Sequence, residues 1–178
     1  MNRYVAFQLG INVGKRQVKM VELRELLEEN GYSNVRTLLA SGNVVFESDE
    51  VSLEKLTEKL DVLMTKHFGF AIKNIVRKFA DIKKLVASDP FKHIAVTPLT
   101  RLYITFLSDK PITQHTIPHV SPDGGFVILF VTSTEVISYK TLSENSGTTD
   151  AMKILVQEFG KNITTRNWNT VKKIAAIY

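Results

Sequence analysis

Residues 165–171 read Thr-Arg-Asn-Trp-Asn-Thr-Val and combine the only tryptophan of the chain with an arginine and two asparagines. Guanidinium and amide groups are donors that proteins use to hold phosphates and carboxylates. We therefore predict that Arg166, Asn167 and Asn169 bind an anionic ligand. The alternative is that Trp168 packs in the core while its polar neighbours only cap a helix.

The spacing of apolar residues places this stretch at the start of a helix. They recur three and four residues apart, at Trp168, Val171, Ala175 and Tyr178. This pattern predicts a short amphipathic helix with Asn167 or Thr165 as its N-cap. A helix N-terminus offers backbone N–H groups and a partial positive charge, which is a physical reason to expect an anion there.

Two glycine-bearing loops supply a second set of candidate ligand-binding residues. The first loop, Gly10–Arg16, follows a predicted strand, and the second is the tight turn Ser41-Gly42-Asn43. Because a βαβ crossover returns the chain to a parallel strand, we expect both loops at the same end of one sheet. The predicted ligand-binding residues on this rim are Asn12, Lys15, Ser41 and Asn43. The alternative is two surface turns that merely share an end.

Catalytic and metal-binding patterns are sparse in this sequence. The chain has no cysteine, which excludes disulfides, Cys-liganded zinc and thiol catalysis. The glycine-rich loop has neither the Walker spacing nor Gly-x-Gly-x-x-Gly. His115 and His119 have the i, i+4 spacing of zinc ligands, but Pro118 lies between them and a third ligand is not nearby. Ser41 has no base placed near it in the sequence. We therefore predict no metal and no cofactor, and we assign no reaction.

Composition indicates a globular protein of moderate positive charge. The chain has 178 residues, 44% of them hydrophobic, and 23 Lys+Arg against 18 Asp+Glu give a net charge of +5. This charge is compatible with nucleic acid or phosphorylated ligands without requiring them. No run approaches the roughly 20 apolar residues of a membrane span, and the first residues lead into a strand-like pattern. We expect a cytoplasmic protein that does not enter a membrane.

The first half of the sequence predicts a ferredoxin-like βαββαβ unit over residues 1–78. Its strands are expected at Arg3–Leu9, Val35–Leu39, Val44–Glu47 and Ala71–Arg77. Two helices, expected at 20–30 and 53–68, alternate with these strands and should cover one face of the sheet. The stripe of the second helix is expected to consist of Leu53, Leu56, Leu60, Leu63 and His67, after Ser52 as N-cap.

The second half is predicted to be a more irregular α+β unit over residues 100–178, after a helix and connection at 79–99. Its expected elements are a strand at Leu102–Leu107, a hairpin of Phe126–Val131 with Glu135–Tyr139, a helix at Ala151–Phe159, a strand at Ile163–Thr165 and the closing helix. Pro111–His119 is ambiguous, and Thr141–Asp150 is a polar loop. The element order resembles a degenerate second copy of the first half, without apparent sequence identity, and we expect one compact structural unit.

Four motifs carry a resemblance to a known family. They are Gly10–Gly14, Ser41–Phe46, Asp89–Phe91 and residues 165–171. Together they resemble the bacterial family called domain of unknown function 1697. The chain departs from that family's pattern at Leu9, where an Arg is expected, and at Lys15, Lys19 and Ala40, where Gly, Pro and Gln are usual. The resemblance implies a cytoplasmic α+β protein of uncertain role and gives the polar motifs a functional meaning.

RNA-recognition modules share the element order of the first half but stack bases on aromatic residues of the sheet. The corresponding strand here, Ser41–Ser48, has one aromatic residue where such modules use three, which disfavours base stacking on the sheet.

Our leading hypothesis is a binding module for an anionic ligand at polar loops: a nucleotide, nucleic acid, or another phosphate or carboxylate compound. One alternative is an unassigned enzyme that uses Glu135, Glu144 or Asp150. The other is a structural homo-oligomer that buries Trp168 and Phe126–Val131 against another copy. Either a monomer or a small homo-oligomer is compatible with the sequence.

Overall fold

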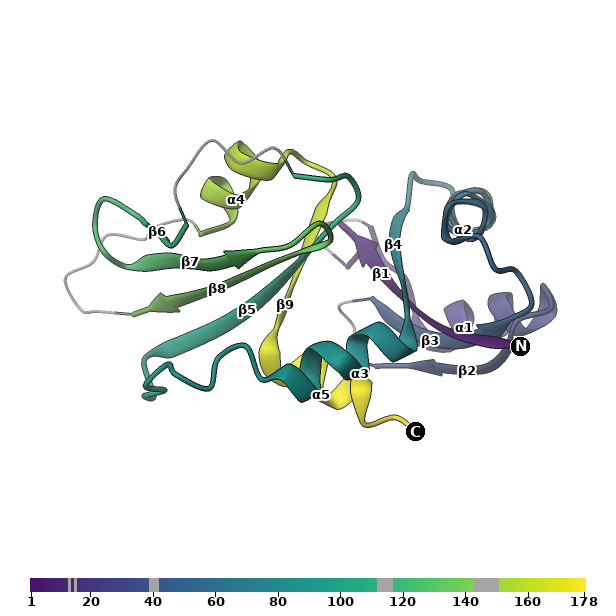
Figure 1. Cartoon of the computed structure of the whole chain (residues 1–178). Helices are drawn as coiled ribbons and strands as arrows, with labels where there is room; N and C mark the ends of the chain where they lie inside the picture. The colour runs from purple at the N-terminus through teal and green to yellow at the C-terminus, as the bar shows by residue number, and fades with distance from the viewer. Residues whose placement is uncertain (13, 15, 39–41, 112–116, 143–150) are drawn as a thin grey trace. The chain divides into compact units, whose positions relative to one another are not determined.

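The computed structural model describes residues 1–12, 14, 16–38, 42–111, 117–142 and 151–178. Two compact units divide the chain: Met1–Ala87 together with Lys173–Tyr178, and Ser88–Lys172 (Figure 1). The helix that follows residue 78 belongs to the first unit as far as Ala87. The division of the chain expected from the sequence stays a prediction. Within the described residues, every helix is too short or too polar to span a membrane.

The first unit contains a four-stranded antiparallel sheet with the predicted element order. Its strands are β1 (Asn2–Leu9), β2 (Ser33–Thr37), β3 (Asn43–Ser48) and β4 (Lys73–Lys78), arranged β2-β3-β1-β4. The helices α1 (Met20–Glu29) and α2 (Leu53–Phe68) follow β1 and β3. The predicted hairpin forms, since Arg36 of β2 pairs with Val45 of β3. The closer assignment to ferredoxin-like folds stays a prediction.

Both helices pack on one face of this sheet, as predicted. Leu23 and Leu27 of α1 and Leu56 and Leu60 of α2 share a buried cluster with residues of the sheet such as Phe46. Local signals define α2: the Ser52 side chain accepts the N–H of Lys55, and Gly69, with a φ of 74°, ends the helix.

One residue of the predicted α2 stripe is not in the core. His67 lies in the last turn of the helix, and its ring nitrogen is 2.9 Å from a carboxylate oxygen of Glu22 on α1. Met64 is the third fully buried residue of the helix, beside Leu56 and Leu60. Phe68, four residues after Met64, packs against the same cluster, so the apolar stripe reaches the end of the helix through Phe68 and not through His67.

The second unit contains a five-stranded antiparallel sheet covered on one face by a helix. Its strands are β5 (Thr100–Leu107), β6 (His119–Val120), β7 (Phe126–Val131), β8 (Glu135–Thr141) and β9 (Ile163–Asn167), arranged β6-β7-β8-β5-β9. The predicted β7–β8 hairpin and the strand at 163 are confirmed. The helix α4 (Ala151–Phe159) buries Leu155 against Phe126, Leu107 and Ile163. His119, from the ambiguous segment, begins β6, while residues 143–150 of the polar loop lie outside the described residues.

The two units repeat one strand arrangement. The order β7-β8-β5-β9 of the second unit reproduces β2-β3-β1-β4 of the first, with the same antiparallel pairings. The register agrees as well, because Val5 pairs with Arg77 in the first unit and Ile104 pairs with Arg166 in the second. Arg77 and Arg166 therefore occupy equivalent positions.

The repeat extends to a sequence similarity that the sequence analysis missed. In each unit a strand passes directly into a helix: β4 into α3 (Phe79–Ser88) and β9 into α5 (Trp168–Ala175). The first junction, residues 77–87, reads Arg-Lys-Phe-Ala-Asp-Ile-Lys-Lys-Leu-Val-Ala, and the second, residues 166–176, reads Arg-Asn-Trp-Asn-Thr-Val-Lys-Lys-Ile-Ala-Ala. The predicted degenerate duplication is thus supported by strand order, register and sequence.

Candidate functional site

A cavity of about 570 Å³ lies in the second unit where β9 passes into α5. It brings together two stretches that the sequence analysis singled out, because Asp89 and Phe91 line it together with Asn167 and Asn169. Its lining residues are Asp89, Phe91, Val96, Thr100, Arg101, Leu102, Asn167, Trp168, Asn169, Thr170 and Lys172. The predicted closing helix begins at Trp168, so Asn167, one of the two N-cap candidates, directly precedes it.

Two aromatic rings form a rigid apolar part of the cavity wall. The ring centres of Phe91 and Trp168 are 5.4 Å apart, and their planes meet at 62°. This tilted, edge-directed geometry is favourable for aromatic pairs. Both side chains are almost fully buried, with 3% and 5% of their surface exposed. Trp168 therefore packs in the core and also lines the cavity.

Polar and cationic side chains form the accessible part of the wall. Asn167, Asn169, Lys172 and Arg101 are all exposed. Asn169 and Lys172 are three residues apart on α5, which places them on neighbouring positions of one helix face. The Nη1 group of Arg101 donates to the carbonyl oxygens of Pro98, at 2.7 Å, and Thr100, at 3.0 Å. These bonds orient the guanidinium and leave its other N–H donors available for a ligand.

Three residues of the cavity were not among the site residues predicted from the sequence: Arg101, Lys172 and Asp89. Asp89 belongs to one of the four family-like motifs, so a signal existed for it. Arg101 and Lys172 carried no such signal, because single surface cations are common and the chain has 23 Lys and Arg. The fold brings both cations to the cavity. Tyr103 of β5 pairs with Asn167 of β9, and Arg101 lies two residues before Tyr103 on the same side of β5.

The first turn of α5 differs from the first turns of three other helices. α1, α2 and α3 carry Glu22, Glu54 and Asp81 in their first turns, whereas α5 has no acidic residue there. Thr170 occupies the position in α5 that corresponds to Asp81 in α3. An acidic residue in the first turn normally offsets the partial positive charge of a helix N-terminus. This charge is therefore not offset by the first turn of α5.

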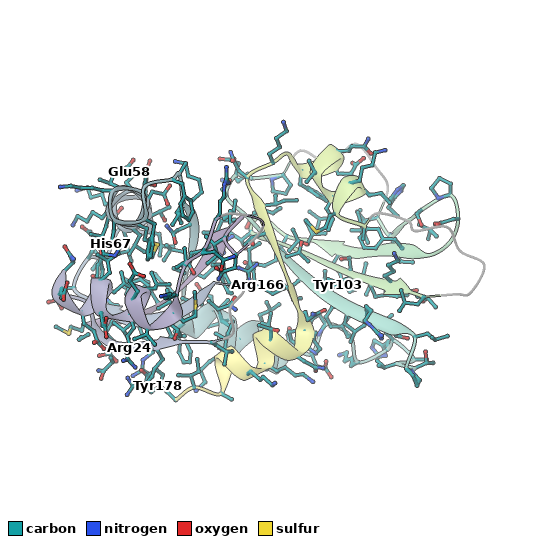
Figure 2. All side chains as sticks on the ribbon, turned by 180° about the vertical axis from the view of Figure 1, so that it is seen from behind. Arg24, Glu58, His67, Tyr103, Arg166 and Tyr178 are labelled. Carbon is teal, nitrogen blue, oxygen red and sulfur yellow. The ribbon has the colours of Figure 1, made fainter. Side chains whose placement is uncertain are left out.

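Arg166 is placed differently from its two predicted partners. Only 8% of its surface is exposed, and its Nη1 group donates to Thr164 Oγ1, at 2.6 Å, and to the carbonyl oxygen of Thr165, at 3.0 Å. Figure 2 labels Arg166 on β9 and Tyr103 on the neighbouring β5. Burial lowers the pKa of Arg166 to about 10, so the guanidinium stays protonated at neutral pH. Arg166 is not among the residues that line the cavity, and direct ligand binding by it stays a prediction.

The two glycine-bearing loops of the first unit are adjacent, as the crossover argument predicted. The N–H of Gln8 donates to the carbonyl oxygen of Gly42 at 3.0 Å. The Asn12 amide accepts the N–H of Val18 at 2.8 Å and donates to its carbonyl oxygen at 3.2 Å. The Asn43 amide donates to the carbonyl oxygen of Leu38 at 2.8 Å. These bonds hold the loops closed, and a ligand-binding role for Asn12 and Asn43 stays a prediction.

Several predicted or considered site residues lie outside the described residues: Lys15, Ser41, His115, Glu144 and Asp150. Glu135, the remaining candidate acid, is bonded within its own turn, because its carboxylate accepts from the hydroxyl groups of Thr132 and Thr134. In the part of the chain that the structure describes, no group of three or more His, Cys, Asp or Glu residues could hold a metal ion.

The fold and the cavity define a mixed α+β protein whose described residues form two antiparallel sheets and five helices. The chain belongs to the family described as "Protein of unknown function (DUF1697)", whose model matches residues 1–123. Three of the four family-like motifs lie in that stretch, and residues 165–171 lie outside it.

A solved structure shows a similar fold over nearly the whole chain. A conserved bacterial protein from Streptococcus pneumoniae is 27% identical in sequence and has a TM-score of 0.75, and the alignment covers 99% of this chain and 98% of that one. No curated protein matches this sequence at a significant level.

Proposed function

We propose that this protein binds a small anionic ligand, with a phosphate or carboxylate group, in the cavity at the start of α5. The observation that carries the proposal is that Arg101, Lys172, Asn167 and Asn169 line one cavity. Guanidinium and ammonium groups bind such anions through charge-assisted hydrogen bonds, and amide N–H groups add neutral donors. The volume of about 570 Å³ is in the range of small-molecule sites, which favours a small ligand over a nucleic acid.

The charge of the cavity supports this proposal. Arg101 and Lys172 bring two positive charges, and Asp89 brings one negative charge. The start of α5 adds a partial positive charge that its first turn does not offset. Arg166 adds a buried positive charge one residue before Asn167. An anion therefore gains favourable Coulomb energy in this part of the molecule.

The equivalent junction in the first unit supports the same conclusion. Lys78, Ala80 and Asp81 occupy the positions that correspond to Asn167, Asn169 and Thr170. A strand that passes directly into a helix therefore forms without either asparagine. Because this fold does not demand amides at these positions, the exposed Asn167 and Asn169 are best explained by a ligand.

Trp168 provides a site-specific test of the proposal, because it is the only tryptophan and lines the cavity. We would titrate sodium pyrophosphate at neutral pH and follow Trp168 fluorescence. Saturable binding is expected, and Arg101→Ala and Lys172→Ala should each weaken it about tenfold or more, as the loss of a hydrogen bond to a charged group does.

Lys83→Ala is the matched control for Lys172→Ala. Lys83 occupies the corresponding position of α3, with its Nζ 5.9 Å from the Phe79 ring centre. This variant should bind pyrophosphate as the unaltered protein does. Equal losses in the Lys83 and Lys172 variants would show a nonspecific charge effect and would contradict the proposed site.

A further inference from the structure

Asp89 is the residue of this cavity that a simple anion site does not explain. Its side chain is exposed and lines the cavity together with Arg101 and Lys172. Within the described residues, no hydrogen bond or ion pair of its carboxylate is found. A carboxylate beside an anion repels it, so Asp89 would weaken a site built for phosphate alone.

An ionised carboxylate only accepts hydrogen bonds, so a ligand that fits beside Asp89 must donate one. The donor can be an amino or a hydroxyl group. The same ligand must carry its anionic group where Arg101, Lys172 and the two asparagine amides can reach it. The charges of the cavity thus point to a ligand with an anionic group and a separate donor group.

The cavity also offers apolar surface that an inorganic anion would leave unused. Val96 is 61% exposed, Leu102 is half-buried, and the largely buried Phe91 and Trp168 also line the cavity. Small-molecule sites combine such apolar walls with a few placed polar groups. A planar ring packed here would cover Val96 and bury apolar surface of its own.

Resting on the proposed function, we infer that the ligand is a nucleoside monophosphate. This class combines the three required parts: a phosphate for the cations and amides, hydroxyl or amino donors for Asp89, and a planar ring for the apolar wall. The inference names the ligand class of the cavity, and it can fail while anion binding itself survives.

The test compares parts of the ligand on one protein. Trp168 fluorescence would be followed at neutral pH with the four common nucleoside monophosphates, with the corresponding nucleosides, and with inorganic phosphate. We expect at least one monophosphate to bind about tenfold or more tightly than both its nucleoside and inorganic phosphate. Lys172→Ala should weaken the binding of that monophosphate, whereas Lys83→Ala should leave it unchanged.

Asp89→Asn tests the donor requirement directly. Asp89 has a φ of 40°, a left-handed conformation that Asn also adopts readily, so the backbone should be retained. The substitution removes the negative charge and should bring the affinities for the monophosphate and for inorganic phosphate within about threefold of each other. The melting temperature of the variant would verify that it is folded.

Failure of the nucleotide inference can be distinguished from failure of the proposed function. If inorganic phosphate or pyrophosphate binds and depends on Lys172, but no monophosphate exceeds phosphate, the nucleotide inference is overturned and the proposed function stands. A nucleoside that binds as tightly as its monophosphate also overturns the inference. If neither the monophosphates nor the inorganic anions bind, the inference and the proposed function are both wrong.

Discussion

The guanidinium carbon of Arg3 lies 3.7 Å from the centre of the Tyr178 ring. The Tyr178 hydroxyl donates to the carbonyl oxygen of Asn34 at 2.7 Å, and the ring meets Phe79 edge-on at 6.1 Å between centres. All four residues belong to the first unit. Tyr178, labelled in Figure 2, therefore ties the segment after α5 to β1, β2 and α3.

We expect Tyr178→Ala to lower the free energy of unfolding by about 1–3 kcal/mol, because it removes a cation–π contact, an aromatic contact and a hydrogen bond. Tyr178→Phe keeps the ring and should cost about 1 kcal/mol or less. Urea unfolding curves of the two variants would measure both effects. Equal stability of the Ala variant and the unaltered protein would show that these contacts contribute nothing.

Glu47 predicts a pH dependence of stability. Hydrogen bonds from Asn34, at 2.6 Å, and then from Arg3, at 2.7 Å, lower the pKa of Glu47 below its ordinary value of 4.5. Since the folded-state pKa is lowered, this stabilisation is present above the pKa of the unfolded chain and is lost as the pH falls through the folded-state pKa. Stability should therefore decline on acidification below about pH 4.5.

Glu47→Gln isolates the contribution of that residue from those of the other acids. The variant should be less stable than the unaltered protein at pH 7, and the difference should shrink as the pH is lowered through the folded-state pKa. Urea unfolding at several pH values between 7 and the acid limit of folding would measure it. A constant difference over this range would mean that the charge of Glu47 is not involved.

Gly42 and Gly69 form a matched pair for measuring a close approach between the two rim loops. Both have a φ of 74°, which is costly for any other residue. A Cβ at residue 42 would lie 2.6 Å from Cδ1 of Ile11 and 2.9 Å from Cβ of Gln8, whereas a Cβ at residue 69 would meet nothing within 4 Å.

Alanine at position 69 should therefore cost only the backbone strain, about 1 kcal/mol, and alanine at position 42 should cost about 1–3 kcal/mol more because of overpacking. The difference between the two unfolding free energies is the measurement. Equal costs would show that the loop after β1 moves away freely.

Local signals made much of the fold predictable. The Ser52 cap and the apolar spacing of residues 53–68 gave α2 because capping and periodicity act within one segment. The two-residue strand β6 was not predicted, because it exists through its pairing with β7 and not through a pattern of its own. The sequence similarity within the internal repeat was not predicted because the two halves share few identical residues. The equivalent strand positions of Arg77 and Arg166 supplied the alignment in which those identities appear.

The candidate site was predictable only in part for a similar reason. Asn167 and Asn169 were found because they lie beside a tryptophan at a helix start. Arg101 was missed because strand pairing of β5 with β9 brings it to the cavity from more than 60 residues away in sequence. Arg166 was predicted to bind the ligand together with these asparagines, but it lies one residue before Asn167 on β9, and its side chain is buried and bonded to the buried Thr164.

Trp168 should contribute mainly to stability. It is 5% exposed and contacts Phe91, so Trp168→Ala should lower the free energy of unfolding by about 3–5 kcal/mol, as large aromatic deletions in cores do. Asn169→Ala, at the next position on α5, alters an exposed side chain and should change stability by less than about 0.5 kcal/mol. Urea unfolding followed by circular dichroism would compare them without relying on tryptophan fluorescence.

Arg166 should contribute to both stability and anion affinity. Arg166→Ala removes the hydrogen bonds to Thr164 and Thr165 and should cost about 1–3 kcal/mol of unfolding free energy. The same variant removes a charge that is retained at neutral pH, since the pKa of Arg166 is about 10. Pyrophosphate affinity, measured by Trp168 fluorescence, should therefore fall as well, and Arg166→Lys should restore part of it.

Arg77→Ala, at the equivalent position of the first unit, is the control and should leave the affinity unchanged. A large loss of stability with unaltered affinity in Arg166→Ala would show that Arg166 is a structural residue and that its predicted role in binding the ligand is wrong.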